Sequence, residues 1–167
     1  MIAVSAAAPA VHDPQLRGRV DDLLTRSALL LDRNDLEGWL DCFDAESRYV
    51  VMPRDNRDRG YPAALIHCDN KARLRDRIAC LRHANKFNPH YDRHIVGAGH
   101  IHSVADGIAV VESSFMVVQT TLTGVSTLFC AGGYEDRVRI TGPAAKFVER
   151  IAVVDSFSVP TLLATPV

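Results

Sequence analysis

The chain has 167 residues, of which 47% are hydrophobic and 23% are charged, and its formal charge is −1 at pH 7. This length corresponds to about one domain with a sizeable core, and the near-zero charge gives no electrostatic reason to expect nucleic acid or an anionic membrane as partner. The longest apolar runs fall short of the ~18 residues that a membrane-spanning helix requires.

The first twelve residues are rich in alanine, but no basic segment precedes their short apolar run, so they are not typical of an export signal. We expect residues 1–12 to form a flexible tail or partner-contacting arm and residues 13–167 to form a single domain. The cysteines include no CxxC pair. Without an export signal, we expect a cytoplasmic protein with reduced, buried thiols at Cys42, Cys68, Cys80 and Cys130.

Two amphipathic helices are predicted at the start of the domain. Asp13 is placed to cap the first helix, because Pro14 follows at a position that favours proline. A second, shorter helix begins near Asn34 or Asp35. The predicted buried stripes, at helical spacing, are Leu16, Val20, Leu23, Leu24, Ser27 and Leu31 in the first helix and Leu36, Trp39, Leu40 and Phe43 in the second.

Two strands and a third helix follow. Residues 48–52 and 63–68 have the composition of strands. Between them, residues 54–60 contain no apolar side chain, which predicts a solvated loop or a polar contact surface. Asp69 or Asn70 caps the third helix. Its predicted buried stripe consists of Leu74, Ile78 and Leu81.

The rest of the chain predicts long strands, at about 93–104, 108–123, 125–140 and 145–157. Gly97 and Gly99 interrupt the first strand, Gly124 favours a hairpin, and the pair Gly132-Gly133 predicts a bulge in the third strand. Long strands with glycine kinks curl, and helices then fill the concave side. The sequence therefore predicts an α+β cone in which N-terminal helices pack into a strongly curved, mostly antiparallel sheet.

Histidines on the first long strand are the strongest candidate metal ligands. His100 and His102 share one face of the strand about 7 Å apart, but His94 lies six residues from His100 and is too distant to complete the set. No carboxylate at ligand spacing follows. We therefore predict no metal site here.

The sequence Cys80-x-x-His83 matches half of a Rieske iron–sulfur pattern. The other half is missing, because Asn70 stands where a histidine would have to follow Cys68. Cys80 also lies beside the apolar stripe of the third helix, so we interpret it as a core thiol.

Acid–base chemistry inside the cone is the remaining catalytic possibility, with candidates Asp41, Asp44, His94, Glu112 and Asp155. Arg150 and Asp155 interrupt an apolar strand, and buried charges are usually paired, so we expect a partner for Asp155 among Arg77, Arg93 and Arg150. A free-standing isomerase, dehydratase or cyclase using His94 or Asp155 stays open, as does a small-ligand binding module.

Several stretches together resemble the small (β) subunit of aromatic-ring-hydroxylating dioxygenases. The resemblance covers nearly the whole chain after Asp13, and among these subunits it is greatest to those serving terephthalate, salicylate 5-hydroxylation and anthranilate. It is carried by Asn88-Pro89-His90-Tyr91, Arg93-His94-Ile95-Val96-Gly97, the segments 64–71 and 74–78, and the ending 149–157 with 160–163.

The resemblance implies a cone of the NTF2-like type, which SnoaL-like proteins and ketosteroid isomerase share. It implies that a large (α) subunit carries the [2Fe-2S] Rieske cluster and the mononuclear Fe(II), that a reductase supplies electrons from NAD(P)H, and that this chain has neither catalytic residues nor a metal.

We accordingly expect a non-catalytic structural β subunit of a terminal oxygenase component that acts on an aromatic carboxylate in aromatic catabolism. The expected assembly is α3β3, with β–β contacts as well as contacts to the large subunit. The expected core-pairing or subunit-contact positions are Asp76, Arg77, Tyr91, Arg93 and His94, together with Arg150 and Asp155.

Overall fold

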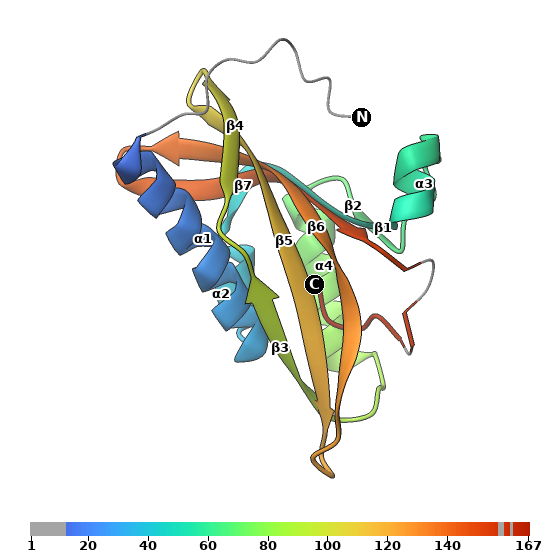
Figure 1. Ribbon diagram of the computed structural model, residues 1–167. Coiled ribbons are helices and arrows are strands. Elements are labelled where there is room, and N and C mark those ends of the chain that lie inside the picture. Colours follow the sequence, from blue (N-terminus) through green and yellow to red (C-terminus); the bar gives the residue numbers. More distant parts are fainter. Residues whose placement is uncertain (1–12, 157–158, 161) are drawn as a thin grey trace.

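The structure, a computed structural model, describes residues 13–156, 159–160 and 162–167 (Figure 1). Its helices are α1 (Pro14–Asp32), α2 (Leu36–Leu40), α3 (Arg54–Arg59) and α4 (Lys71–His83). Its strands are β1 (Phe43–Pro53), β2 (Ile66–Cys68), β3 (His90–Val96), β4 (His100–Ala105), β5 (Ile108–Thr121), β6 (Ser126–Thr141) and β7 (Ala144–Val154). The predicted tail, residues 1–12, lies outside the described residues.

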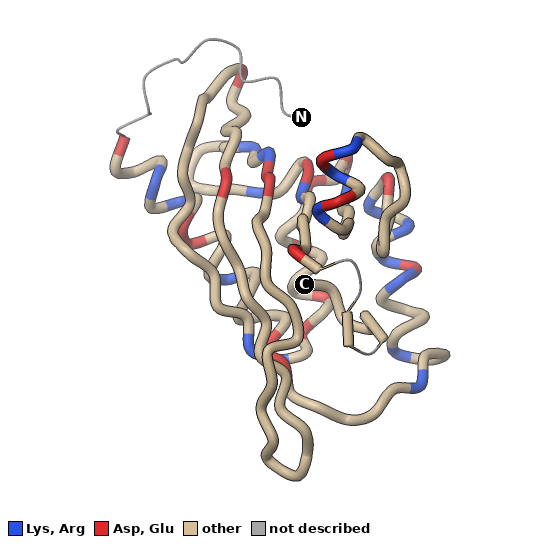
Figure 2. Tube along the Cα trace, turned by 45° about the vertical axis from the view of Figure 1, so that its right-hand side comes forward, with Lys and Arg blue, Asp and Glu red and all other residues tan. Residues whose placement is uncertain are grey.

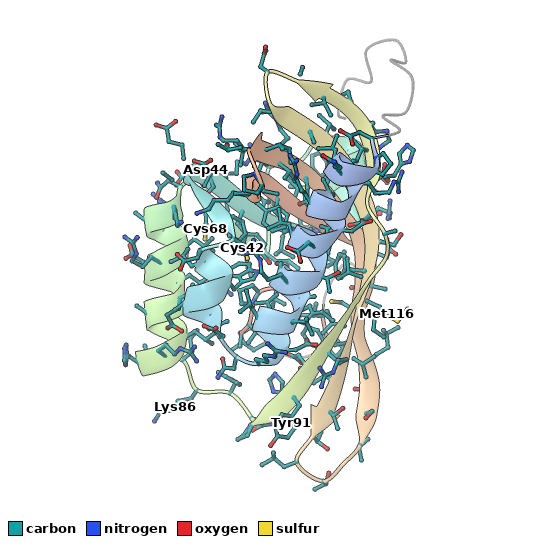
Figure 3. The ribbon with its side chains drawn as sticks, turned by 90° about the vertical axis from the view of Figure 1, so that its left-hand side faces the viewer. Cys42, Asp44, Cys68, Lys86, Tyr91 and Met116 are labelled. Atoms are coloured by element: carbon teal, nitrogen blue, oxygen red, sulfur yellow. The ribbon has the colours of Figure 1, made fainter. Side chains whose placement is uncertain are left out.

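One curved sheet organises the domain, in the order β2-β1-β7-β6-β5-β3, and β4 pairs with β5 beyond the end of β3. Every pairing is antiparallel except that of β1 with β7, which is parallel. Helices α1, α2 and α4 lie on one side of the sheet, and the core forms between them and the strands (Figures 1 and 3). The predicted α+β cone is therefore confirmed.

The helices form where their apolar spacing places them. Asp13 caps α1 by accepting hydrogen bonds from the N–H groups of Gln15 and Leu16, and Asn70 caps α4 through the N–H of Arg73. Both predicted buried stripes of α1 and α4 are confirmed. Among the described residues, no helix is long and apolar enough to cross a membrane.

Residues 54–60 correct one expectation, because most of them form a helix rather than a loop. Helix α3 buries none of its residues, yet it has favourable ends: Asp55 in the first turn, Arg57 and Arg59 in the last, and Gly60 in the left-handed conformation behind them. Ion pairs from Arg54 to Asp155 and from Arg57 to Glu135 connect this polar helix to the sheet. Helical periodicity cannot reveal such a helix, since it has no apolar face.

Cys80 corrects a second expectation. Cys42, Cys68 and Cys130 are buried as predicted, whereas Cys80 is exposed. The buried stripe of α4 passes through Ile78 and Leu81, and the position between them points away from the core.

The pair Gly132-Gly133 corrects a third expectation. Both residues continue the regular pairing of β6 with β5, and the register shift between these strands lies instead at Phe129, where Cys130 and Leu128 face consecutive residues of β5. Gly132 has a different role. A Cβ atom there would lie 1.9 Å from the carbonyl oxygen of Val153 on β7, so only glycine allows the two strands to approach this closely.

We expect Gly132→Ala to destabilise the fold by about 3 kcal/mol, because backbone must shift to admit the methyl group. Gly133→Ala is the matched control, since the nearest atom to its added Cβ lies at an ordinary 3.6 Å. Urea unfolding of both variants measures the difference. Equal midpoints would contradict the close approach of β6 and β7.

Candidate functional site

The interior of the cone contains an ion pair. Arg150 of β7 donates to the carboxylate of Asp136 on β6 through Nε at 3.0 Å and Nη2 at 2.8 Å, and both side chains are almost completely buried. Register explains the meeting, because these residues are direct partners across the β6–β7 ladder. Burial lowers the pKa of Arg150, but the charge and hydrogen bonds of Asp136, together with Tyr134 and Tyr49, raise it overall, whereas burial raises the pKa of Asp136 itself. The guanidinium is therefore held in its charged form.

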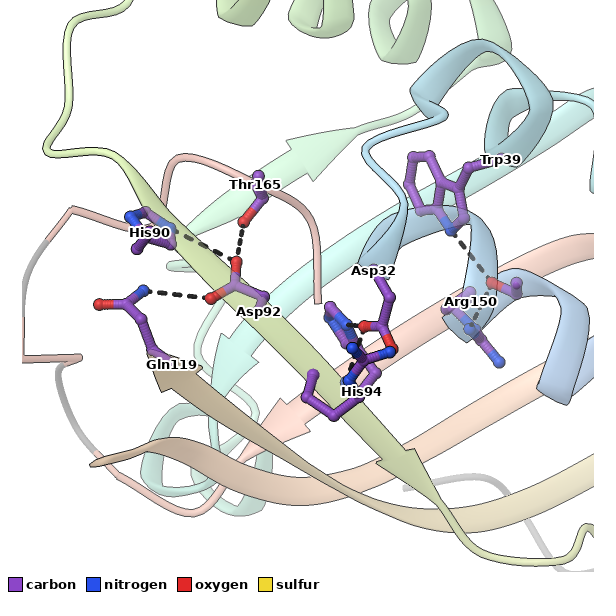
Figure 4. A network of polar contacts seen from close by, with 10 residues as sticks. Asp32, Trp39, His90, Asp92, His94, Gln119, Arg150 and Thr165 are labelled. Carbon is purple, nitrogen blue, oxygen red and sulfur yellow. Dashed lines mark hydrogen bonds and ion pairs between the residues drawn. The ribbon is translucent and has the colours of Figure 1, made fainter. Parts of the chain in front are cut away.

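Aromatic rings enclose this pair. The guanidinium carbon of Arg150 lies 4.0 Å from the centre of the Tyr134 ring and 3.9 Å from that of Phe147. Its Nη1 donates to Ser27 Oγ at 3.3 Å, and Trp39 Nε1 donates to the same hydroxyl at 3.0 Å (Figure 4). The centre of the cone is thus filled by side chains that satisfy one another.

The C-terminal segment, residues 162–167, is tied to the cone at three places. The Tyr49 hydroxyl donates to the carbonyl oxygen of Val167 at 2.8 Å and accepts from its N–H at 3.0 Å. Arg77 donates to the carbonyl oxygens of Leu163 and Ala164, and Thr165 donates to Asp92 at 2.9 Å. Burial raises the pKa of Tyr49, so its hydroxyl keeps its proton for this contact.

A second buried group joins the end of α1 to the edge strand β3. Asp32, whose side chain is 2% exposed, accepts from the backbone N–H of His94 at 2.8 Å, from His94 Nδ1 at 2.8 Å and from Arg93 Nη1 at 3.0 Å (Figure 4). Because the carboxylate only accepts, Nδ1 of His94 carries the hydrogen. His94 Nε2 is buried and has no hydrogen-bond partner among the described residues.

The pKa of Asp32 results from opposing effects. Burial raises it. The hydrogen bonds from the ring and backbone of His94 and the charge of Arg93 together lower it by more than burial raises it, so the net pKa lies below the ordinary value of 3.8. This carboxylate is therefore ionised near neutral pH. Together, Asp32 and His94 have the geometry of an acid–base dyad.

The predicted contact residues fall in different places. Asp155 is exposed and accepts from Arg54 Nε at 2.7 Å, so the expected partners Arg77, Arg93 and Arg150 were wrong. Asp76 lies on the exposed face of α4, and Tyr91 is exposed on β3. The structure thus brings together Arg93 with His94, but not the seven residues as one site.

The other acid–base candidates are also dispersed. Asp44 accepts from Arg139 at 2.8 Å, and Glu112 contacts His102 Nε2 at 3.0 Å. Asp41 lines a groove of about 710 Å³ between α1 and the β6–β7 turn, together with Arg19 and Lys146. The lining of this groove mixes both signs of charge, which Figure 2 shows along the same elements.

The histidine pair on β4 forms no metal centre in the part of the chain that the structure describes. The rings of His100 and His102 contact each other edge-on with centres 4.7 Å apart. Across the described ranges, no group of three or more His, Cys, Asp or Glu residues is placed to hold a metal ion.

Sequence reasoning missed Asp136 and Asp32, although a signal existed for each. Asp136 shares the inward parity of its strand with Tyr134 and Val138, and Asp32 lies four residues after buried Ala28 on α1. A carboxylate at a buried position of a regular element predicts a buried cation or donor nearby.

Comparisons with known proteins show that the chain is similar to one protein family. The model of the family described as ring hydroxylating beta subunit matches residues 26–161. The chain is 38% identical over 137 residues to anthranilate 1,2-dioxygenase small subunit of Burkholderia cepacia, covering 82% of this chain and 85% of that protein. It is 35% identical over 139 residues to terephthalate 1,2-dioxygenase, terminal oxygenase component subunit beta 2, of Comamonas sp, covering 83% and 90%.

Two solved structures are also similar. The beta subunit assigned to an aromatic-ring-hydroxylating dioxygenase of Novosphingobium aromaticivorans has a TM-score of 0.83 and 36% identity, over 91% of this chain and 97% of that chain. A protein of the same organism assigned as a scytalone dehydratase has a TM-score of 0.64 and 14% identity, over 83% of each chain. The latter likeness concerns the fold alone, and it agrees with the predicted α+β cone.

We expect Arg150→Met and Asp136→Leu each to lower the free energy of unfolding by about 3–5 kcal/mol, because each leaves an unpaired buried charge. The double variant should lose less than the sum of the two, since it leaves no charge behind. Arg139→Met, which breaks an exposed pair, is the control and should cost under about 1 kcal/mol. Strictly additive losses in urea unfolding would contradict the coupling.

The depressed pKa of Asp32 predicts a pH dependence. Its ionised form adds stability that is complete above the unfolded pKa near 3.8 and is lost as the pH falls through the lower folded pKa. The difference in unfolding free energy between wild type and Asp32→Asn should therefore shrink from about pH 5 to about pH 3. A difference that stays constant over this range would show that Asp32 is not stabilised as an anion.

Proposed function

Because the chain belongs to the ring hydroxylating beta subunit family, we propose that it is the non-catalytic β subunit of the terminal oxygenase component of an aromatic-ring-hydroxylating dioxygenase. In this role the chain supplies shape and contact surface to a large oxygenase subunit. The complete enzyme takes part in the catabolism of aromatic compounds in this proposal. The β subunits and large subunits assemble as α3β3 in this proposal, with additional contacts between β subunits.

The main observation that supports a non-catalytic role is that side chains fill the interior of the cone. A cone-shaped enzyme needs an open cavity in which a substrate meets acid–base groups. Here the guanidinium of Arg150 occupies that volume between the rings of Tyr134 and Phe147, and Asp136 neutralises it. The residues 162–167 are bound to the same cone through Tyr49 and Arg77.

The substrate of the complete enzyme is proposed from its relatives. Anthranilate and terephthalate, which the names of two relatives contain, are both carboxylates on an aromatic ring. We propose an aromatic carboxylate of this type, including salicylate, for the assembled oxygenase. The large subunit holds the [2Fe-2S] Rieske cluster and the mononuclear Fe(II) in this proposal, and NAD(P)H provides electrons through a reductase.

One observation favours a second candidate function, a free-standing isomerase, dehydratase or cyclase. The Asp32–His94 dyad leaves Nε2 of His94 buried and free to accept a proton or hydrogen bond. Its surroundings argue for a structural role, because the same carboxylate also binds the His94 backbone and Arg93. Turnover of a small cyclic substrate by the isolated chain, lost in His94→Ala, would favour this alternative.

We expect the purified chain alone to leave anthranilate, terephthalate and salicylate unchanged, and ring hydroxylation to require the cognate large subunit and a reductase. His94→Ala in this chain should leave the iron content of the large subunit intact. Product formation is followed by chromatography and iron by atomic absorption. Hydroxylation by the isolated chain, or separate elution of the two wild-type subunits, would refute the proposal.

A further inference from the structure

The face of the sheet opposite the helices carries a group of apolar side chains around one arginine. We call it the outer-sheet patch, and it consists of Tyr91, Arg93, Ile95, Met116, Val118 and Leu128. Strand register brings these residues together, because Ile95 pairs with Met116, and Val118 pairs with both Arg93 and Leu128. Figure 3 places Met116 on the side of the sheet away from the helices.

The exposed apolar area has the size of the largest apolar patch on a typical soluble protein, which is often functional. Tyr91, Ile95, Met116 and Leu128 are between 42% and 66% exposed, and Leu122 and Val125 extend the surface at the β5–β6 turn. Six half-exposed side chains of this size present roughly 500 Å² of apolar area, and each partner in a standard interface contributes about 800 Å². The patch with its intervening main chain approaches that size.

Arg93 belongs to the patch and is bound by a buried carboxylate. Its side chain is 66% exposed, while Nη1 donates to the buried carboxylate of Asp32. Asp32 is in turn fixed by His94. The remaining N–H groups of Arg93 have no hydrogen-bond partner in the part of the chain that the structure describes. The exposed arginine therefore keeps N–H groups that a further acceptor can bind, and arginine is enriched among the residues that dominate interface energetics.

The charge of the patch distinguishes between possible occupants. None of its six residues is acidic, and the nearest acidic residue on the outer face of β5, Glu112, is engaged by His102. In a two-fold pairing of two copies the same patch meets itself, so each Arg93 would face a surface without an anion. The carboxylate that Arg93 binds must therefore lie outside this patch, and the large subunit of the proposed assembly is a chain that can supply it.

We propose that the outer-sheet patch binds the large oxygenase subunit, through an apolar surface of that subunit surrounding a carboxylate that Arg93 binds. Asp32 acts as a positioning residue for this arginine. The inference rests on the proposed function, since it names the contact by which the β subunit joins its partner.

The test is co-purification with an affinity-tagged cognate large subunit. Met116→Glu and Arg93→Gln should each reduce the recovered β subunit at least tenfold, while the melting temperature of the isolated variants stays close to that of wild type. Leu65→Glu is the matched control, because Leu65 is equally exposed (41%) but adjoins β2 at the opposite edge of the sheet. It should assemble like wild type.

Oxidation gives an independent measurement. Met116 should react with hydrogen peroxide in the isolated chain and be protected at least fivefold in the complex, as read by mass spectrometry. Normal assembly of both patch variants, or an unprotected Met116, overturns the inference and leaves the proposed function intact. Loss of self-association alone in the variants also overturns it, in favour of a second copy. Failure of the wild-type chain to bind the large subunit overturns the proposed function itself.

Discussion

The domain depends on one buried charge being neutralised at its centre. Arg150 and Asp136 are direct neighbours across the β6–β7 ladder, and they satisfy each other where neither has access to water. The rings of Tyr134 and Phe147 and the hydroxyl of Ser27 then have a fixed partner on which to pack. The centre of the cone is therefore filled by side chains that contact one another.

The two faces of the sheet consequently have different physical characters. The inner face is closed by α1, α2, α4 and the segment 162–167, and its central ion pair is fully buried. The outer face keeps large apolar side chains in water, with Arg93 bound from behind by Asp32. Asp32 connects the two faces, because its carboxylate accepts hydrogen bonds both from the buried His94 and from the exposed Arg93. The buried dyad, which has the form of catalytic machinery, thereby also binds a surface arginine.

Much of this fold was predictable from periodicity. The stripes of α1 and α4, the cap Asp13 and the break between β3 and β4 were all found correctly, and the cap of α4 was narrowed to Asp69 or Asn70. The family was identified separately, from motifs along the chain. Features that depend on long-range contacts were not predicted. Helix α3 has no apolar face, the role of Gly132 depends on how closely β7 approaches, and the partner of Asp155 lies 101 residues away at Arg54. The same limit applies to the central site: Arg150 was correctly singled out, but its partner Asp136 becomes apparent only when the register of β6 against β7 is known.

The parallel pairing of β1 with β7 has a consequence for how the chain is made. Residues 43–53 leave the ribosome well before residues 144–154. During synthesis, β1 with Tyr49 and Val51 therefore lacks its neighbouring strand β7. Non-local strand pairing of this kind is slow and leaves apolar surface open to aggregation. Additional chaperone during translation should therefore increase the amount of folded subunit that a host cell accumulates.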